Sequence, residues 1–266
     1  MKQIPNIFTL LNLFLGCVAI IYIVQPGLAP VFREVNPEYL AAGVNNDGTQ
    51  YVSVPEQAVI GSILIGAAAV VDFLDGFVAR LFKATSDIGK QLDSLADVVS
   101  FGVAPGMIIY EFLRMSVALQ TNGLDAGIIW LLPAFIVPCA GAYRLARFNI
   151  DTRQVNGFKG VPIPAAGLLI ASFPLIYWFS GTEWITGLFT NKWFWYGIII
   201  IASWLMVSTL PMMALKFKNF SLQDNWPKLL LAIVAIIAAI FLQWLAVPLV
   251  FVVYVLLSLL LKLNVS

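Results

Sequence analysis

Apolar runs long enough to cross a lipid bilayer recur along almost the whole chain, and this feature limits the fold more than any other. A membrane-crossing helix needs roughly 17–25 mostly apolar residues. Only 11% of the 266 residues are charged, against about 25% in soluble domains. The sequence therefore predicts an all-α transmembrane helix bundle of about eight spans in a single domain, 1–266. The spans are expected near 6–25, 58–82, 93–117, 125–146, 161–180, 193–214, 228–243 and 245–262.

Lysine and arginine are distributed unevenly between the loops that join these spans. If the N-terminus is cytoplasmic, only Arg33, Arg114 and Lys192 of the 15 Lys and Arg residues fall on the outer side. Cytoplasmic loops of membrane proteins carry the excess of positive charge. We therefore predict that both termini are cytoplasmic. The net charge of +1 provides no general attraction to nucleic acid, and we expect no nucleic-acid partner.

Four aspartates lie where the second and third spans approach the same membrane face. Asp72 and Asp75 are near the end of the second span, and Asp93 and Asp97 are near the start of the third. An ionised Asp inside a span costs about 2.5–3.5 kcal/mol, so this group needs counter-charges, water or bound cations. Residues three or four apart share a helix face, so two antiparallel helices can bring the acids together. Oxygen ligands suit Mg²⁺, Mn²⁺ or Ca²⁺, and the chain has no histidine to supply a nitrogen ligand.

Small and basic residues accompany the first pair of acids on the same helix face. Gly76 and Ala79 leave little side-chain bulk there, so a phosphate-bearing group can approach the backbone. Arg80 follows at the same spacing, and its guanidinium can donate several hydrogen bonds to a phosphate. The segment therefore combines cation ligands with a phosphate-binding surface.

Taken together, residues 72–97 have the pattern D-x2-D-G-x2-A-R-x8-G-x3-D-x3-D. This pattern resembles the full signature of the CDP-alcohol phosphatidyltransferase family. The resemblance implies a six-helix catalytic core, here about 1–215, with two extra spans at about 228–262. It also implies a homodimer and a two-metal site, with Mg²⁺ or Mn²⁺, that opens to the cytoplasm. The implied metal ligands are Asp72, Asp75, Asp93 and Asp97, of which Asp97 is also the general base. The implied CDP-binding residues are Asn6, Thr9, Gly76, Ala79, Arg80 and Gly89.

Three further stretches are similar to the branch of this family that uses L-serine as acceptor. They are IPNIFTLLNLFLG, DSLADVVSFGVAP, and RLARFN followed by GVPIP; one departure is Tyr143, where the branch often has Leu. The implied reaction converts CDP-diacylglycerol and L-serine into phosphatidylserine and CMP. Arg144 and Arg147 are candidates to bind the serine carboxylate, and Ser94 and Ser100 are candidates to shape the acceptor site. Because the chain lacks histidine, a route through a phosphatidyl-histidine is excluded, which leaves direct displacement.

Other functions are compatible with parts of this pattern. Relatives within the family use glycerol phosphate or inositol phosphate as acceptor, and these would need a more basic pocket. A cation transporter also carries acids within its spans, but here no second acidic group continues the path through the bilayer. A membrane scaffold without activity is the third alternative.

Overall fold

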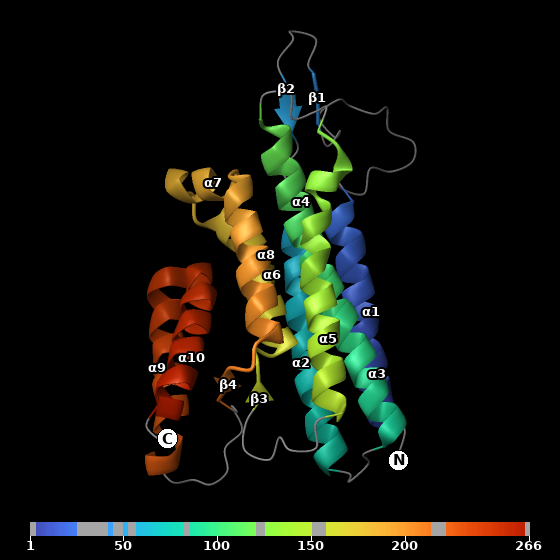
Figure 1. The fold of residues 1–266 in the computed structure, drawn as a ribbon, viewed down its shortest axis with the longest axis vertical. Helices are drawn as coiled ribbons and strands as arrows, with labels where there is room; N and C mark the ends of the chain where they lie inside the picture. The colour runs from blue at the N-terminus through green and yellow to red at the C-terminus, as the bar shows by residue number, and fades with distance from the viewer. Residues whose placement is uncertain are drawn as a thin grey trace.

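The computed structural model of the chain describes residues 4–25, 42–44, 50–52, 57–81, 86–120, 126–150, 158–213 and 222–263. Its helices lie side by side along a common direction (Figure 1), which confirms the predicted all-α membrane bundle. Five helical segments within these ranges are long and apolar enough to cross a bilayer, and two shorter apolar helices, Ile163–Phe179 and Lys192–Val207, accompany them. The protein is therefore an integral membrane protein. The five longer segments are Asn6–Val24, Ala58–Val78, Ile88–Ala118, Ile128–Ile150 and Asn225–Leu261.

The third span is made of three helical segments in series. It begins with α3 (Asp87–Asp97), continues as a π-helix (Val98–Val103) and ends with α4 (Ala104–Ala118). Ser86 caps α3, because its side-chain oxygen accepts a hydrogen bond from the Gly89 N–H at 3.0 Å. The helix thus starts before residue 93, where hydropathy alone placed it. Short π-helical segments are often found at functional sites, and this one follows Asp97 directly.

The helices that carry the remaining site residues pack around this span. They are α1 (Ile4–Val24), α2 (Ala58–Leu81), α5 (Ile136–Ile150) and α6 (Ile163–Phe179). Helix α1 lies along α2, and α5 and α6 both contact the π-helix. A Cβ on Gly167 of α6 would lie 2.7 Å from the Phe101 carbonyl oxygen. Glycine is therefore needed there for the close approach of the two backbones, as is common between membrane helices.

Short elements connect and cover these spans. Two 3₁₀ segments (Ile128–Trp130 and Leu132–Phe135) precede α5, and α7 (Glu183–Phe189) precedes α8 (Lys192–Val207). The sixth span was expected to continue to residue 214, but α8 ends at Val207 because the chain then enters a short strand. The strands form two antiparallel pairs: β1 (Ala42–Val44) with β2 (Gln50–Val52), and β3 (Phe158–Lys159) with β4 (Pro211–Met212).

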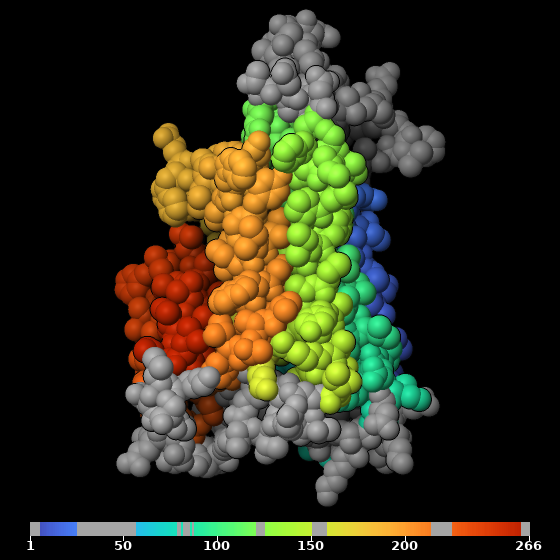
Figure 2. Space-filling model, in the orientation of Figure 1, coloured from blue at the N-terminus to red at the C-terminus, as the bar shows by residue number. Residues whose placement is uncertain are grey.

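The last two helices form a hairpin at one side of the bundle. Helix α9 (Leu222–Leu242) and helix α10 (Ala246–Leu263) are joined by a 3₁₀ turn (Gln243–Leu245) in which Gln243 has a φ of 50°. This turn confirms the hinge predicted near Gln243, although α9 begins six residues before the predicted start at 228. Figure 2 shows the hairpin in red next to α8, on the side opposite α5, and α10 contacts α6.

Aromatic side chains fill one half of the bundle core. Phe112 and Phe173 both pack against Phe189 and Trp195, and the closest pair, Phe112 and Trp195, has ring centroids 4.8 Å apart. The buried Trp195 Nε1–H donates a hydrogen bond of 2.7 Å to the Phe189 carbonyl oxygen. We call this half, with α7 and the start of α8, the aromatic end. The opposite end, where α1 and α3 begin (Figure 1), is the acidic end.

Candidate active site

Three carboxylates converge at the acidic end of the bundle. Asp72 of α2 and Asp93 and Asp97 of α3 each offer an oxygen, and these oxygens all lie within 4.8 Å of one another. Asp97 is buried, while Asp72 and Asp93 are partly buried. The two helices therefore bring their acidic faces together, as the spacing of the aspartates predicted.

Asp75 lies one helical turn beyond Asp72, beside this cluster. It is buried and accepts a short hydrogen bond from the Thr9 hydroxyl of α1. It is also close enough to Asp72 and Asp93 for mutual electrostatic repulsion. The four predicted metal ligands thus share one small region, with Asp75 held at its margin by α1.

Three polar residues of α1, spaced three apart, lie along the acidic cluster. Asn6 lies against α3, since a Cβ on Gly89 would be 3.2 Å from the Asn6 Oδ1. Thr9 contacts Asp75, and Asn12 lies beside Asp97. Asn6 and Thr9 were expected at the site from the sequence, whereas Asn12 was not. The signal was available, because Asn12 continues their spacing as a polar residue within an apolar run.

The other predicted nucleotide-binding residues lie on the same two helices as the acids. Gly76 follows Asp75 in α2, and Gly89 lies in the first turn of α3. Ala79 and Arg80 belong to the last turns of α2. The side chains of these last two residues lie outside the described part of the structure, so their predicted contacts stay predictions.

Arg144, one of the four predicted serine-binding residues, interacts with Asp97 of the acidic cluster. It projects from α5, is 5% exposed and is close enough to Asp97 for an electrostatic interaction. Its guanidinium carbon lies 5.4 Å from the centroid of the Phe148 ring. Within the described residues, its Nε has no hydrogen-bond partner.

The donors of the other three residues contact the protein itself. Arg147 donates hydrogen bonds of 2.8 and 2.9 Å to the carbonyl oxygens of Val207 and Ser208, at the C-terminus of α8. Ser94 accepts a 2.8 Å hydrogen bond from the Asn149 amide and donates one of 3.2 Å to the Lys90 carbonyl oxygen. These contacts hold α3, α5 and α8 together.

Ser100 has a similar structural contact within the π-helix. Its hydroxyl is fully buried and donates a 2.9 Å hydrogen bond to the backbone carbonyl oxygen of Asn12. A Cβ on Gly16, one turn further along α1, would lie 2.3 Å from this hydroxyl and 2.8 Å from the Ser100 Cα. The glycine thus lets α1 approach the π-helix and fixes the position of Asn12.

The residues of this site lie within a region that matches a known protein family. The family model for CDP-alcohol phosphatidyltransferase matches residues 2–215, a range that includes the four aspartates of the site and the residues that contact them. The chain belongs to this family. The two C-terminal helices α9 and α10 lie beyond the matched range.

Curated relatives of the chain have one name in common. A Helicobacter pylori protein called CDP-diacylglycerol–serine O-phosphatidyltransferase is 31% identical over 246 residues, which is 90% of this chain and 81% of the relative. Proteins of the same name from Methanocaldococcus jannaschii and Bacillus subtilis are 44% and 40% identical over 110 and 115 residues. Those two alignments cover 41% and 43% of this chain, and 48% and 60% of the relatives.

The acidic cluster of this phosphatidyltransferase fits a divalent cation by the chemistry of its donors. Three carboxylate oxygens within 4.8 Å repel one another, and Arg144 is the cation that interacts with Asp97. The Asp97 Oδ1 is buried and has no hydrogen bond within the described part of the chain. Oxygen-only donors suit Mg²⁺ or Mn²⁺ rather than softer metals, and a bound cation would relieve the repulsion.

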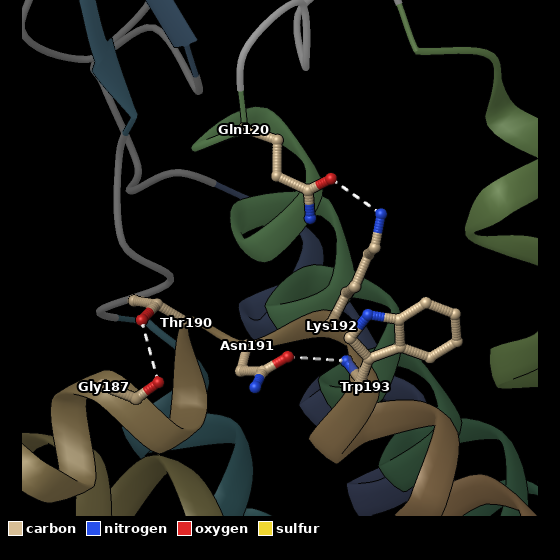
Figure 3. Close-up of a pocket in the computed structure, with 6 residues that line it drawn as sticks. All are labelled: Gln120, Gly187, Thr190, Asn191, Lys192 and Trp193. Atoms are coloured by element: carbon tan, nitrogen blue, oxygen red, sulfur yellow. Dashed lines mark hydrogen bonds between the residues drawn. The ribbon is translucent and has the colours of Figure 1, made fainter.

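A hollow of about 480 Å³ lies at the aromatic end, far from this cluster. Its lining includes no carboxylate, and the Lys192 Nζ donates a 2.7 Å hydrogen bond to the Gln120 side-chain oxygen across it (Figure 3). Lys192 also lies between the rings of Trp130 and Trp193, 5.7 and 5.6 Å from their centroids. This arrangement is typical of a helix end anchored at the membrane–water interface. The lining residues are Gln120, Gly187, Thr190, Asn191, Lys192 and Trp193.

Proposed function

We propose that this protein transfers the phosphatidyl group of CDP-diacylglycerol to L-serine and releases CMP. Its family membership supports transfer from a CDP-activated lipid. The shared name of its curated relatives supports serine as the acceptor. The observation that carries the proposal is the convergence of Asp72, Asp93 and Asp97 beside a buried arginine at one end of a membrane bundle. A lipid with chains in the bilayer and a charged head group can reach such a position from the membrane.

The aspartates provide the ligands for the proposed cofactor. We assign Asp72, Asp75, Asp93 and Asp97 to two Mg²⁺ or Mn²⁺ ions, which when bound supply positive charge to the pyrophosphate of the lipid donor. Thr9 holds the Asp75 carboxylate from α1 and so fixes one oxygen of this set. The CDP group is assigned to the surrounding face, made of Asn6, Thr9, Gly76, Ala79, Arg80 and Gly89.

Asp97 is assigned as the general base. The serine hydroxyl gives its proton to the Asp97 carboxylate, and the serine oxygen forms a bond to the lipid-side phosphorus. The bond between that phosphorus and the oxygen of CMP breaks, and CMP leaves. A positioned base of this kind contributes about 10²–10⁴-fold to a rate.

Arg144 is assigned as the ligand of the serine carboxylate. It is buried next to Asp97, and its Nε has no hydrogen-bond partner in the part of the chain that the structure describes. A carboxylate bound there would place the serine hydroxyl near the base. Arg147, Ser94 and Ser100 are assigned to the support of this site, because their polar groups bind other parts of the protein.

Orientation and assembly complete the proposal. We propose that the acidic end and both termini face the cytoplasm, and the excess of Lys and Arg in the loops on that side supports this orientation. We also propose a homodimer, as the family resemblance implies. Cysteine labelling of residue 2 or 266 in sealed vesicles, and the mass of the protein in nanodiscs, measure these two features.

The proposed function is tested by CMP release from CDP-diacylglycerol. L-serine, glycerol phosphate and inositol phosphate are offered separately, with Mn²⁺ or Mg²⁺ and with a chelator. Of the three acceptors, we expect only serine to give CMP release. We expect the chelator to abolish that release. Release with glycerol phosphate and none with serine would refute the serine assignment.

The general base has its own test. Asp97→Asn should reduce turnover by about 10²–10⁴-fold, because the amide cannot accept the hydroxyl proton. Ser203→Ala, which removes a buried hydroxyl on α8, is the control and should retain turnover. Turnover close to wild type in Asp97→Asn would refute the assignment of the base.

A further inference from the structure

Unpaired polar atoms on three helices meet beside the general base. Asn12 of α1 is 0% exposed and its amide faces the Asp97 carboxylate, yet neither its Nδ2 nor its Oδ1 forms a hydrogen bond of full geometry within the described residues. The same holds for the Asp97 Oδ1 on α3 and the Arg144 Nε on α5. Asp97 lies close to both Asn12 and Arg144, so these atoms belong to one polar group.

Such a group is costly unless something binds to it. A buried polar atom without a partner costs about 1–3 kcal/mol, and nearly all buried polar atoms in proteins are paired with protein or water. The other unpaired buried atoms in the described chain are single serine hydroxyls, on Ser62, Ser180 and Ser203. The group around Asp97 differs because it combines an amide, a carboxylate and a guanidinium.

Asn12 is also held in a fixed position. Its backbone carbonyl accepts the 2.9 Å hydrogen bond from Ser100, and Gly16 lets α1 lie directly against the π-helix. The backbone of Asn12 is therefore fixed against the π-helix, and its side chain projects from a set position beside Asp97. A preorganised, unpaired amide of this kind is suited to bind a ligand.

The order of the contacts along α1 indicates which ligand the Asn12 side chain binds. Asn6 lies at Gly89, Thr9 binds Asp75 and Asn12 reaches Asp97. Asn12 is thus about 9 Å further along the helix axis than Asn6, at a rise of 1.5 Å per residue. The residues assigned to the nucleotide precede those assigned to the metal, and Asn12 lies with the base and the arginine.

We propose that the Asn12 side chain binds the amino-acid part of the acceptor, together with Arg144, and so sets its position against Asp97. The proposal rests on the proposed function and extends it by a residue that determines acceptor binding. An amide can donate to a carboxylate and accept from an ammonium group. Serine carries both groups, whereas a phosphorylated polyol carries no ammonium. Asn12 therefore favours a zwitterionic acceptor.

The test is a comparison of the two Michaelis constants in purified, metal-loaded enzyme. Asn12→Ala should raise the KM for serine about 10–100-fold, the range expected when a hydrogen bond to a charged group is lost. The KM for CDP-diacylglycerol should not change. Ser62→Ala is the matched control, because it also removes a buried polar atom that has no hydrogen bond within the described residues. Ser62 lies ten residues before Asp72 in α2, about 15 Å along the helix, and its loss should leave both constants unchanged.

Other patterns would overturn the proposal. An equal rise in both constants would place Asn12 at the nucleotide or in general support of the fold. A lower kcat with both constants unchanged would make it a residue that acts on Asp97 rather than on the acceptor. Unchanged kinetics would remove any role.

Separate control experiments test whether the variant folds and whether the proposed function is correct. If Asn12→Ala does not yield folded protein, Asn12→Ser keeps a small polar side chain, and the same split in the two constants is expected from it. A wild-type enzyme that releases CMP with glycerol phosphate but not with serine would refute the proposed function before any variant is compared. With a wild type active on serine, the kinetics of the variants judge Asn12 alone.

Discussion

The two ends of the bundle contain buried charge in opposite arrangements. At the aromatic end, Glu111 is 3% exposed and accepts hydrogen bonds of 3.0 and 2.5 Å from the Arg114 guanidinium. Lys192 at the same end binds Gln120 and two indole rings. At the acidic end, three carboxylates are gathered within 4.8 Å, and buried atoms of Asp97 and Arg144 are unpaired within the described chain.

The charges of the aromatic end are paired within the protein and support the fold, whereas those of the acidic end are suited to bind a ligand. A buried ion pair such as Glu111–Arg114 satisfies both partners, and its loss leaves an uncompensated charge. Carboxylates that repel one another lower the stability of the fold until a cation or substrate binds. The two ends should therefore respond oppositely to substitution: the acidic end should lose activity and the aromatic end should lose stability.

The largest effect is expected for a metal ligand at the acidic end. Asp93→Asn should reduce CMP release by at least about 100-fold, as is typical when a group that stabilises transferring charge is removed. In the absence of metal its Tm should equal or exceed that of the wild type, because one of the repelling charges is gone. Thermal unfolding with and without Mn²⁺, together with the activity assay, measures both.

The metal response supplies the control for this prediction. Saturating Mn²⁺ should raise the wild-type Tm, since a ligand at 100 times its Kd stabilises by about 2.7 kcal/mol. Asp93→Asn should show a much smaller rise. If its Tm without metal is well below that of the wild type, the acids contribute to folding like those of the aromatic end, and the contrast between the two ends is refuted.

The buried pair of the aromatic end should give the next largest effect. Glu111→Ala should lower stability by about 2 kcal/mol, at the lower side of the cost of breaking a buried pair, because Arg114 is partly exposed and can turn toward water. The folded fraction should retain wild-type KM values for serine and CDP-diacylglycerol. The double variant Glu111→Ala/Arg114→Met should recover part of the stability, and a loss of turnover in the folded protein would contradict the assignment of this pair to the fold.

A glycine substitution next to the site is expected to have a smaller effect that combines both responses. Gly16→Ala places a Cβ 2.3 Å from the Ser100 hydroxyl and 2.8 Å from its Cα, so the backbones must separate. Overpacking of this kind costs about 1–3 kcal/mol, and here it also moves Asn12. Gly66→Ala, in α2, has no atom within 4 Å of the added Cβ and serves as the control. Equal stability and activity in the two variants would refute the close packing of α1 on the π-helix.

The convergence of the acids could be predicted from the sequence because it depends on spacing alone. Asp72 on one helix and Asp93 and Asp97 on the next obey the helical period, and a short connection requires the two helices to lie antiparallel. The spans were likewise found from runs of apolar residues. The predicted third span began at residue 93 because residues 87–92, which open α3, are mostly polar. Ser86, which caps the helix, is a normal N-cap residue.

Contacts between distant segments could not be predicted in this way. Arg144 and Arg147 are three residues apart, and both were predicted from the sequence to bind the serine carboxylate. The structure separates them because Arg147 reaches the carbonyl oxygens at the end of α8, whereas Arg144 faces Asp97. The π-helix after Asp97 and the unpaired amide of Asn12 also depend on how α1, α5 and α6 pack around the third span. Local sequence carries little information about such packing.

The smallest effect is expected at the hollow of the aromatic end. Lys192→Ala removes one exposed hydrogen bond to Gln120 and two cation–π contacts, and exposed interactions of this kind contribute about 1 kcal/mol or less. CMP release should equal that of the wild type, because Lys192 is the first residue of α8. This start of α8, beside α7, lies at the end of the bundle opposite the starts of α1 and α3 (Figure 1). Activity and Tm in nanodiscs measure the two quantities. A fall in turnover without a fall in Tm would show that this end takes part in catalysis, and the division of roles between the two ends would then be wrong.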